Sequence, residues 1–453
     1  MEDYSKRIAH TLRGQFNDLK RRPEDVAREL SYPLEKINDY ISGRDKPSEE
    51  FYQLFTDFYP VNRRDLHIIK DDCPEGVKIM RAEESAATSR VMNRAGKPYY
   101  EYRDTAMSSV GQFRPEWIKE LCVVDNNDPE NPDVQWNNGH FMHQFTYFIG
   151  PVNFYYKGED GKKNVAVMNT GDSMYITPFV PHTFTTRKND TGESGLILAL
   201  TYGNKLAGDT QQELSALGVD LASEYAFDFS SREKYFASML SFHREAASVG
   251  VKELAHRSGL AKEIIENFEN GKVVPEIAVL QSLAKSLSIN VRDLLPFDSK
   301  ENKVIVQNYA DNKRWFYPEN QKSYEIVELS VTKDLPHSKS FEFNLQANNS
   351  FELDLKCGLH QYGYNTGDKT VQINWRSGGK DYSATVSPGD SFYVKPFIHH
   401  NFRGENGKLL VLRIGGRVAG EPLRELSLIG KDSAYRAIAE TMPWFNKEGR
   451  SKI

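Results

Sequence analysis

Cysteine is scarce in this chain of 453 residues. The three present are Cys73, Cys122 and Cys357, and no two of them form a Cys-x-x-Cys pair. An odd number without that spacing argues against a disulfide framework or a thiolate zinc site, and fits a reducing cytoplasm. No run approaches the roughly 18 apolar residues of a membrane span, and the start MEDYSKRIAH lacks the apolar centre of a signal peptide. We therefore expect a cytoplasmic protein with no membrane partner.

An excess of positive charge is also absent. Lys and Arg number 58 against 63 Asp and Glu, which gives a formal net charge of −5. Without an overall positive field, nucleic acid or an anionic membrane is not held by counterion release, so any anion site must be local. At roughly 150 residues per domain, the length predicts three or four domains.

What the chain does contain is an internal repeat. Residues 25–66 and 253–294 align without a gap, and the matched residues are Ala27 with Ala255, Gly43 with Gly271, Pro47 with Pro275, and Arg64-Asp65-Leu66 with Arg292-Asp293-Leu294. Apolar residues at helical spacing, with breaks at Ser31-Tyr32-Pro33 and Ser258-Gly259, predict several short helices in each copy. Both copies resemble the Cro/repressor-like helix-turn-helix domain. An unspecific helical bundle is the alternative.

A second repeat follows each helical block. GDSMYITPFVPHTF at 171–184 matches GDSFYVKPFIHHNF at 389–402, and HQFTYFIG at 143–150 matches HQYGYNTG at 360–367. The surrounding stretches alternate, are rich in Val, Tyr and Phe, and are separated by Gly and Asn turns, which predicts antiparallel barrels or sandwiches. Gly-Asp-Ser before a strand, a Pro and a His resembles the second motif of the cupin family. The expected fold is therefore mixed α and β, a tandem repeat of a helix-turn-helix-like domain followed by a cupin β-barrel (a bicupin).

This order predicts four domains and a tail. We expect a helix-turn-helix-like domain at 1–70, a catalytic cupin at 90–203, a second helix-turn-helix-like domain at 234–298, and a second, non-catalytic cupin at 320–418 with a helical extension to 453. Linkers are expected near 67–90, 203–233 and 296–320.

Three polar side chains of the first cupin are candidate metal ligands. If HFMHQF is one strand, its side chains alternate, so His140 and Gln144 share a face while His143 points away. With His182 they form a set of two histidines and one glutamine. A bulge would instead turn His140, His143 and His182 inward as three imidazoles. The histidines could also fill a polar barrel without a metal, but burying them without a partner is costly, which favours metal binding.

The second cupin retains fewer of these donors. His400 is kept, but Cys357 stands where the first cupin has His140, and the other nearby histidines fall on the wrong face. Cys357, Gln361 and His400 remain a candidate set. Because a free cysteine usually behaves as a small buried hydrophobe, we expect this barrel to be structural.

The order helical, cupin, helical, cupin, with NNGH at 137–140 and Pro181-His182, resembles a small family of iron(II)-dependent, O2-using phosphonate enzymes. Its members are 2-hydroxyethylphosphonate dioxygenase and methylphosphonate synthase. The dioxygenase uses His, Glu and His, and its Glu lies six residues before the second His, where this chain has Ile176. The synthase uses two His and one Gln, and this chain resembles it at His140, Gln144 and His182. The resemblance implies Fe(II) as the metal.

The resemblance also implies a reaction and a binding site. The synthase cleaves the C–C bond of 2-hydroxyethylphosphonate with O2, giving methylphosphonate and bicarbonate, and the alternative outcome is that of the dioxygenase, hydroxymethylphosphonate and formate. A phosphonate dianion needs a cation and neutral donors near the metal. The resemblance carries this role to Arg94, Tyr102, Asn137, Lys20 and Thr201. Lys20 and Tyr102 are also candidate catalytic residues, and in a homo-oligomer Lys20 would act in its own or in a neighbouring subunit.

A helix-turn-helix joined to a cupin is also the plan of a ligand-sensing transcription regulator. Such a protein needs a recognition helix that reaches DNA phosphates and base edges. The expected recognition helices at 34–42 and 260–270 are acidic, the first with Glu35 and Asp39 against Lys36. They repel DNA, so we expect no nucleic-acid partner.

Overall fold

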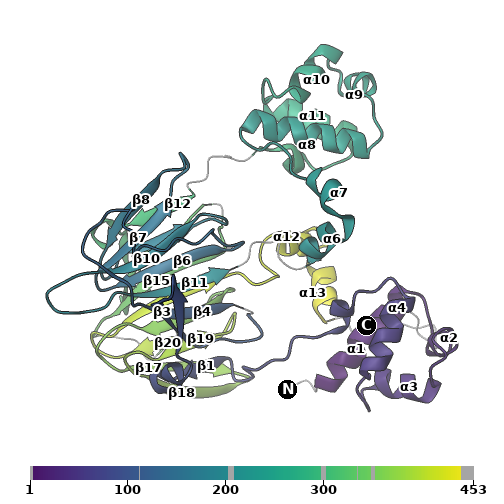
Figure 1. Cartoon of the computed structure of the whole chain (residues 1–453). Coiled ribbons are helices and arrows are strands. Elements are labelled where there is room, and N and C mark those ends of the chain that lie inside the picture. Colours follow the sequence, from purple (N-terminus) through teal and green to yellow (C-terminus); the bar gives the residue numbers. More distant parts are fainter. Residues whose placement is uncertain are drawn as a thin grey trace.

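We describe the protein from a computed structural model over residues 4–111, 113–202, 209–296, 303–333, 335–347 and 352–439. These residues form a mixed α and β structure in which four sheets lie together and two separate helical units lie to one side of them (Figure 1). Within these ranges, no helix is long and apolar enough to cross a membrane.

The first helical unit comprises α1 (Tyr4–Asp18), α2 (Pro23–Glu29), α3 (Leu34–Ser42), α4 (Glu49–Phe58) and a 3-10 turn at Arg63–Leu66. Its helices begin and end where the local sequence indicates. Proline begins α2, and Gly43, in the left-handed conformation, ends α3. The unit has an apolar core of its own, centred on Val26, Ile37, Phe51 and Phe55.

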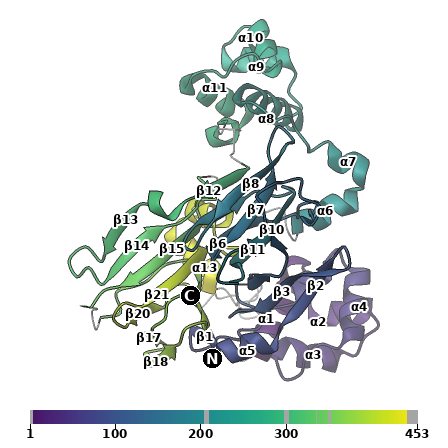
Figure 2. The same cartoon turned by 60° about the vertical axis from the view of Figure 1, so that its left-hand side comes forward.

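The second helical unit comprises α8 (Arg232–Ala246), α9 (Val251–Ser258), α10 (Lys262–Glu269), α11 (Ile277–Leu287) and a 3-10 turn at Val291–Leu294. It also encloses its own core, and it lies at the opposite end of the molecule from the first unit (Figures 1 and 2). The remaining helices are α5 (Ala82–Ala87), α6 (Asp209–Leu217), α7 (Val219–Ser223), α12 (Glu421–Leu428) and α13 (Lys431–Ala439).

Two of the sheets pack face to face and form what we call the first sandwich. One sheet has the order β12-β9-β6-β11-β4-β3-β2 and the other β5-β10-β7-β8. The strands are β2 (Arg90–Arg94), β3 (Lys97–Asp104), β4 (Arg114–Glu120), β5 (Val123–Val124), β6 (His143–Ile149), β7 (Val152–Lys157), β8 (Lys163–Met168), β9 (Ser173–Ile176), β10 (His182–Arg187), β11 (Leu196–Tyr202) and β12 (Val304–Gln307). Phe148, Phe154 and Phe184 lie in the apolar layer between the sheets.

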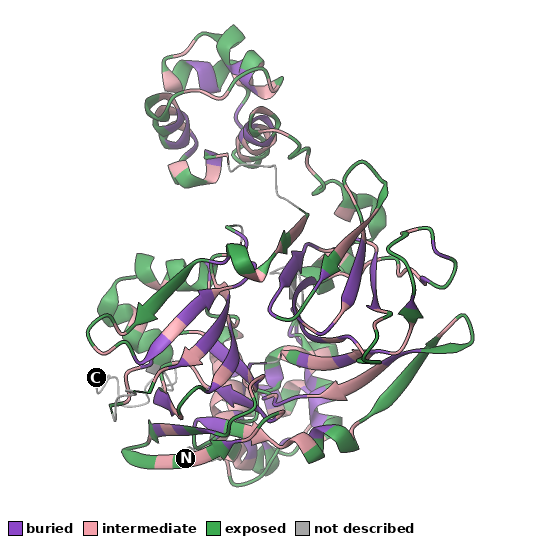
Figure 3. Ribbon diagram, turned by 90° about the vertical axis from the view of Figure 1, so that its left-hand side faces the viewer, coloured by how far each residue is buried: buried purple, intermediate pink, exposed green. Residues whose placement is uncertain are grey.

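The second sandwich repeats this arrangement. Its sheets have the orders β1-β19-β16-β21-β15-β14-β13 and β18-β17-β20. The strands are β1 (Val77–Met80), β13 (Arg314–Tyr317), β14 (Tyr324–Glu328), β15 (Ser338–Leu345), β16 (His360–Asn365), β17 (Val371–Ser377), β18 (Lys380–Val386), β19 (Ser391–Val394), β20 (His399–Arg403) and β21 (Lys408–Ile414), with a 3-10 turn at Tyr309–Asp311. Buried residues follow the strands of both sandwiches and the inward faces of the helices (Figure 3).

The sandwiches exchange one strand each. Strand β1, which precedes the first sandwich in the chain, pairs antiparallel with β19 of the second. Strand β12, which precedes the second sandwich, pairs antiparallel with β9 of the first. Both strands fall in segments that the sequence predicts as linkers, 67–90 and 296–320. A layer rich in tyrosine, including Tyr147, Tyr175 and Tyr393, joins the two sandwiches.

Candidate metal centre

His140 lies in a loop, because β6 begins only at His143. The expectation of one continuous strand through His140 is therefore wrong. Phe179, which lies between β9 and β10, holds this loop in place, because its N–H donates to the His140 carbonyl at 2.9 Å. This close approach requires Gly139, whose φ is +77° and where an added Cβ would lie 2.6 Å from the Phe179 carbonyl carbon. The Asn137 side chain accepts from the Gly139 N–H at 2.9 Å and completes the turn.

The loop carries His140 to two side chains of the first sandwich. His140 Nε2 lies 3.0 Å from Gln144 Oε1, and the rings of His140 and His182 meet edge to face with centroids 5.1 Å apart. Gln144 and His182 are buried, on β6 and at the start of β10. Thr201 is the direct partner of Gln144 on the neighbouring strand β11. The structure thus brings together the three candidate ligands and one of the candidate substrate contacts.

Both histidines are oriented through Nδ1, which leaves Nε2 facing this space. His140 Nδ1 donates to the Met142 carbonyl at 2.9 Å, and His182 Nδ1 donates to the Val180 carbonyl at 2.8 Å. Since a carbonyl only accepts, Nδ1 of each ring carries a proton. Burial lowers the pKa of His182 to about 4, so this ring is neutral at pH 7, the form that binds a metal.

The orientation of Gln144 is set by a residue that the sequence did not single out. Gln144 Nε2 donates to Thr146 Oγ1 at 2.9 Å, and this leaves Oε1 facing His140. His140 Nε2 and Gln144 Oε1, 3.0 Å apart, are close enough to bind one cation together. Two imidazole nitrogens and one amide oxygen fit a divalent transition metal. Thr146 lies two residues after Gln144 and therefore on the same face of β6, and this spacing in the sequence could have predicted the contact.

No carboxylate takes part in this set. Within the described ranges, no group of three His, Cys, Asp or Glu side chains has the geometry of a metal site. Ile176 is the direct partner of Gln144 on β9 and is fully buried. The strand position from which a carboxylate would reach the two histidines is therefore occupied by an apolar side chain, while the amide comes from the adjacent strand.

His143 lies on the opposite face of β6. Its ring stacks against Tyr175 and Tyr202, with centroids 5.8 and 5.9 Å away, and Nδ1 bonds the Tyr175 hydroxyl. Burial lowers its pKa to about 4. His143 belongs to the layer between the two sandwiches, so the structure does not form the set of three imidazoles.

Arg94 is held beside the second histidine. It ends β2 and donates to the Gln135 carbonyl at 2.6 Å and to the Thr183 hydroxyl at 3.1 Å, and Thr183 follows His182 in β10. Its guanidinium lies over the rings of Tyr99 and Tyr100, 5.1 and 4.7 Å from their centroids. Among the described residues, no ion pair within 4 Å joins Arg94 to a carboxylate, and the buried Glu120 lies within its electrostatic reach.

Two further candidate residues carry protons that they can donate. Burial raises the pKa of Tyr102, on β3, to about 12, so its phenol stays protonated at neutral pH. The Asn137 amide nitrogen lies 3.3 Å from His182 Nε2, while its oxygen accepts from the His182 backbone N–H at 2.8 Å. Because the Nδ1 proton of His182 points at Val180, the Asn137 N–H donates to His182 Nε2, which orients this histidine and places an N–H donor at the candidate metal centre.

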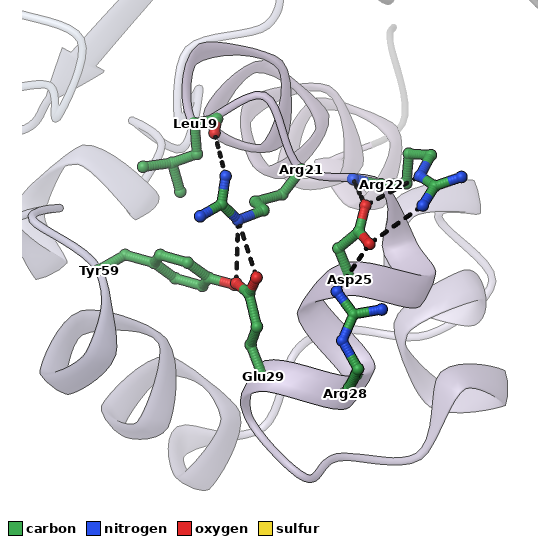
Figure 4. Close-up of polar contacts among 7 residues, drawn as sticks. All are labelled: Leu19, Arg21, Arg22, Asp25, Arg28, Glu29 and Tyr59. Atoms are coloured by element: carbon green, nitrogen blue, oxygen red, sulfur yellow. Dashed lines mark hydrogen bonds and ion pairs between the residues drawn. The ribbon is translucent and has the colours of Figure 1, made fainter.

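Lys20 is not brought to this space. It lies exposed in the turn between α1 and α2, in the left-handed conformation with φ 55°. Its basic neighbours are held locally, Arg21 by Glu29 at 3.0 Å and Arg22 by Asp25 at 2.9 Å (Figure 4). In the single chain the first helical unit lies apart from β6 and β10 (Figure 1). A role for Lys20 at the metal centre therefore requires a second subunit.

No protein-family model matches the chain. Over 448 residues it is 53% identical to the methylphosphonate synthase of Nitrosopumilus maritimus (strain SCM1), which covers 99% of this chain and 97% of that protein. The chain belongs to the methylphosphonate synthase family. The family resemblance seen in the sequence is thus confirmed.

Solved structures share the fold of this family member. HEPD of Streptomyces albus, with 2-hydroxyethylphosphonate and Fe(II) bound, matches with a TM-score of 0.88 and 37% identity, over 97% of this chain and 99% of that chain. PhpD, complexed with cadmium and hydroethylphosphonate, matches with a TM-score of 0.74 and 18% identity, over 96% of this chain and 99% of that chain. At that identity the second match concerns the fold alone.

Proposed function

We propose that this protein is a methylphosphonate synthase, which converts 2-hydroxyethylphosphonate and O2 to methylphosphonate and bicarbonate at one Fe(II). The observation that carries the proposal is the 53% identity to a synthase over almost the whole chain. The match to HEPD with 2-hydroxyethylphosphonate and Fe(II) supports the same substrate and metal. His140, Gln144 and His182 are the proposed ligands, because their two imidazole rings and one amide oxygen converge.

The neutral ligand set has an electrostatic consequence for the substrate. Fe(II), when bound, would supply the Lewis acidity that binds the substrate oxygens and the position at which O2 is activated, while the substrate supplies the four electrons that O2 accepts. Gln144 adds no negative charge and Ile176 supplies no carboxylate, so the site keeps the full charge of the metal. A phosphonate dianion is attracted more strongly there than to a site with a carboxylate ligand.

The proposed substrate contacts divide by chemistry. Arg94 supplies a cation, Asn137 an amide N–H, and Tyr102 and Thr201 hydroxyl groups for the phosphonate and alcohol oxygens. Lys20 would add a second cation from a neighbouring subunit of a homo-oligomer. Tyr102 and Lys20 stay candidate catalytic residues, and Tyr102 can donate a proton because burial raises its pKa to about 12.

We interpret the architecture from the same family resemblance. The two sandwiches are cupin barrels, the second without catalysis, and the helical units are helix-turn-helix-like packing elements within the four domains expected from the sequence. The cytoplasmic location and the absence of a nucleic-acid partner remain predictions, the second because the expected recognition helices, α3 and α10, are acidic.

Phosphorus NMR of protein loaded anaerobically with Fe(II), then given 2-hydroxyethylphosphonate and O2, tests the function. Wild type should form methylphosphonate, and His182→Ala should lose bound iron and turnover together. His143→Phe is the matched control, since its ring faces the core and iron and turnover should stay. Hydroxymethylphosphonate as the sole product would establish the dioxygenase outcome instead, and an iron-replete His182→Ala would refute the ligand set.

A further inference from the structure

The second sandwich repeats the backbone of the metal centre with different side chains. Cys357 stands where the first sandwich has His140, and its carbonyl accepts from the Phe397 N–H at 2.7 Å, as that of His140 does from Phe179. His400, fully buried on β20, donates from Nδ1 to the Ile398 carbonyl at 2.9 Å, as His182 does to Val180. Gln361 follows Cys357 at the spacing of the first sandwich. An amide and an imidazole therefore lie in two of the ligand positions, and Cys357 stands at the third position in the chain, where its thiol bonds the Leu359 backbone.

A guanidinium occupies this second set. Arg413 on β21 is the direct partner of Gln361, as Thr201 on β11 is of Gln144. Arg413 Nε donates to Gln361 Oε1 at 2.8 Å. The equivalent atom in the first sandwich, Gln144 Oε1, faces His140. The amide of Gln361 is consequently turned, and its Nε2 lies 3.2 Å from His400 Nε2. Gln361 Oε1 and His400 Nε2 thus each accept a hydrogen bond.

The residue two positions after Gln361 on β16 also explains the orientation of the Gln361 amide. Gly363 stands where the first sandwich has Thr146, so no hydroxyl holds the amide of Gln361 in the metal-binding orientation. A side chain does not fit there, because an added Cβ would overlap the Phe392 ring. The orientation of the amide is therefore decided by Arg413.

Arg413 is a permanent positive charge among these donors. Its guanidinium lies over Phe341 and Phe343, 5.4 and 5.8 Å from the ring centroids, and no ion pair joins it to a carboxylate in the described part of the chain. An arginine does not lose its proton in a protein. Burial, and to a smaller extent the charge of Arg413, lowers the pKa of His400 to about 4, which places the guanidinium within electrostatic reach of the imidazole.

We propose that Arg413 takes the part of the metal ion in the second sandwich, where Cys357, Gln361 and His400 form a latent metal site closed by the guanidinium. The proposal rests on the assignment of the first metal centre. Removing the guanidinium opens the site to a divalent ion, and a set of thiolate, imidazole and amide suits a borderline-soft ion such as Co(II) or Zn(II).

Co(II) binding to the full-length protein under anaerobic conditions tests this. The His182→Ala background removes the first site, and Arg413→Thr in that background should bind one Co(II) per chain with a near-ultraviolet thiolate-to-cobalt band. Arg413→Lys is the control, because it keeps the charge, and it should bind at least about tenfold more weakly. Arg413→Gln keeps the carbon chain of the side chain as far as Cδ without the charge, and it gives the same test if the threonine variant unfolds.

The outcomes separate this proposal from the first assignment. Folded Arg413→Thr and Arg413→Gln proteins without the Co(II) band would overturn the latent site, as would a band that survives Cys357→Ala. Co(II) bound by His182→Ala alone would instead refute the ligands of the first sandwich. In that case the band that depends on Cys357 still decides the second site.

Discussion

Replacing Thr146 by valine removes the hydroxyl that accepts a hydrogen bond from Gln144 Nε2 at 2.9 Å. Thr146 is fully buried on β6, two residues from Gln144 and on the same face. Valine has nearly the same shape and the same branch at Cβ, so strand and packing should persist. The substitution therefore changes one property of the metal centre, the orientation of its amide.

The expected loss follows from the hydrogen bond. A buried amide N–H without an acceptor costs about 1–3 kcal/mol. In the metal-free variant the amide of Gln144 turns to avoid this cost, as that of Gln361 does beside Gly363. Metal binding must then turn Oε1 of Gln144 back toward the metal, so the cost of the unpaired amide N–H is lost from the free energy of metal binding. The dissociation constant for Fe(II) should rise about 10- to 100-fold, the usual effect of removing a group that orients a metal ligand.

Anaerobic competition with a chromophoric chelator measures that constant for wild type, Thr146→Val and Thr146→Ser. Serine keeps the hydroxyl, so its Fe(II) affinity should stay near that of wild type. The lost methyl group should lower the free energy of unfolding by about 0.5–1.5 kcal/mol, which urea unfolding detects. Equal Fe(II) affinity in wild type and Thr146→Val, or equal losses in both variants, would refute the reasoning.

Two further substitutions test the turn and the buried imidazoles. Gly139→Ala should lower Fe(II) affinity and cost on the order of 1–3 kcal/mol of unfolding free energy, because φ is +77° and the new Cβ would meet the Phe179 backbone. Chelator competition measures the affinity and urea unfolding measures the stability. Unchanged values would show an unstrained turn. The metal-free protein should lose stability as the pH falls from about 6.5 toward 4, because burial holds the pKa of His400 at about 4 and the unfolded chain therefore takes up the proton first. Urea unfolding across that range should show a smaller loss in His400→Gln, by up to about 3 kcal/mol, and parallel profiles would contradict a buried neutral ring.

Features that depend on neighbouring residues in the chain were predicted from the sequence. The repeated helical segments, the strands around the two Gly-Asp-Ser motifs, and the family followed from residue types at helical or strand spacing. The opposite directions of His143 and Gln144 also followed, because side chains alternate within a single strand. Such patterns report which face of its own element a residue takes.

Tertiary packing decided what lies against each face. Strands β1 and β12 are four residues long, and they are strands only because β19 and β9 offer edges to pair with. His140 reaches Gln144 from a loop, not from a strand, because the Phe179 backbone holds that loop in place. Gln144 presents its oxygen to His140, whereas the equivalent Gln361 presents its nitrogen to His400, since Thr146 lies beside the first amide and Arg413 lies opposite the second. Neither neighbour follows from spacing along the chain, because strand register and the contacts between sheets are set by packing over the whole molecule.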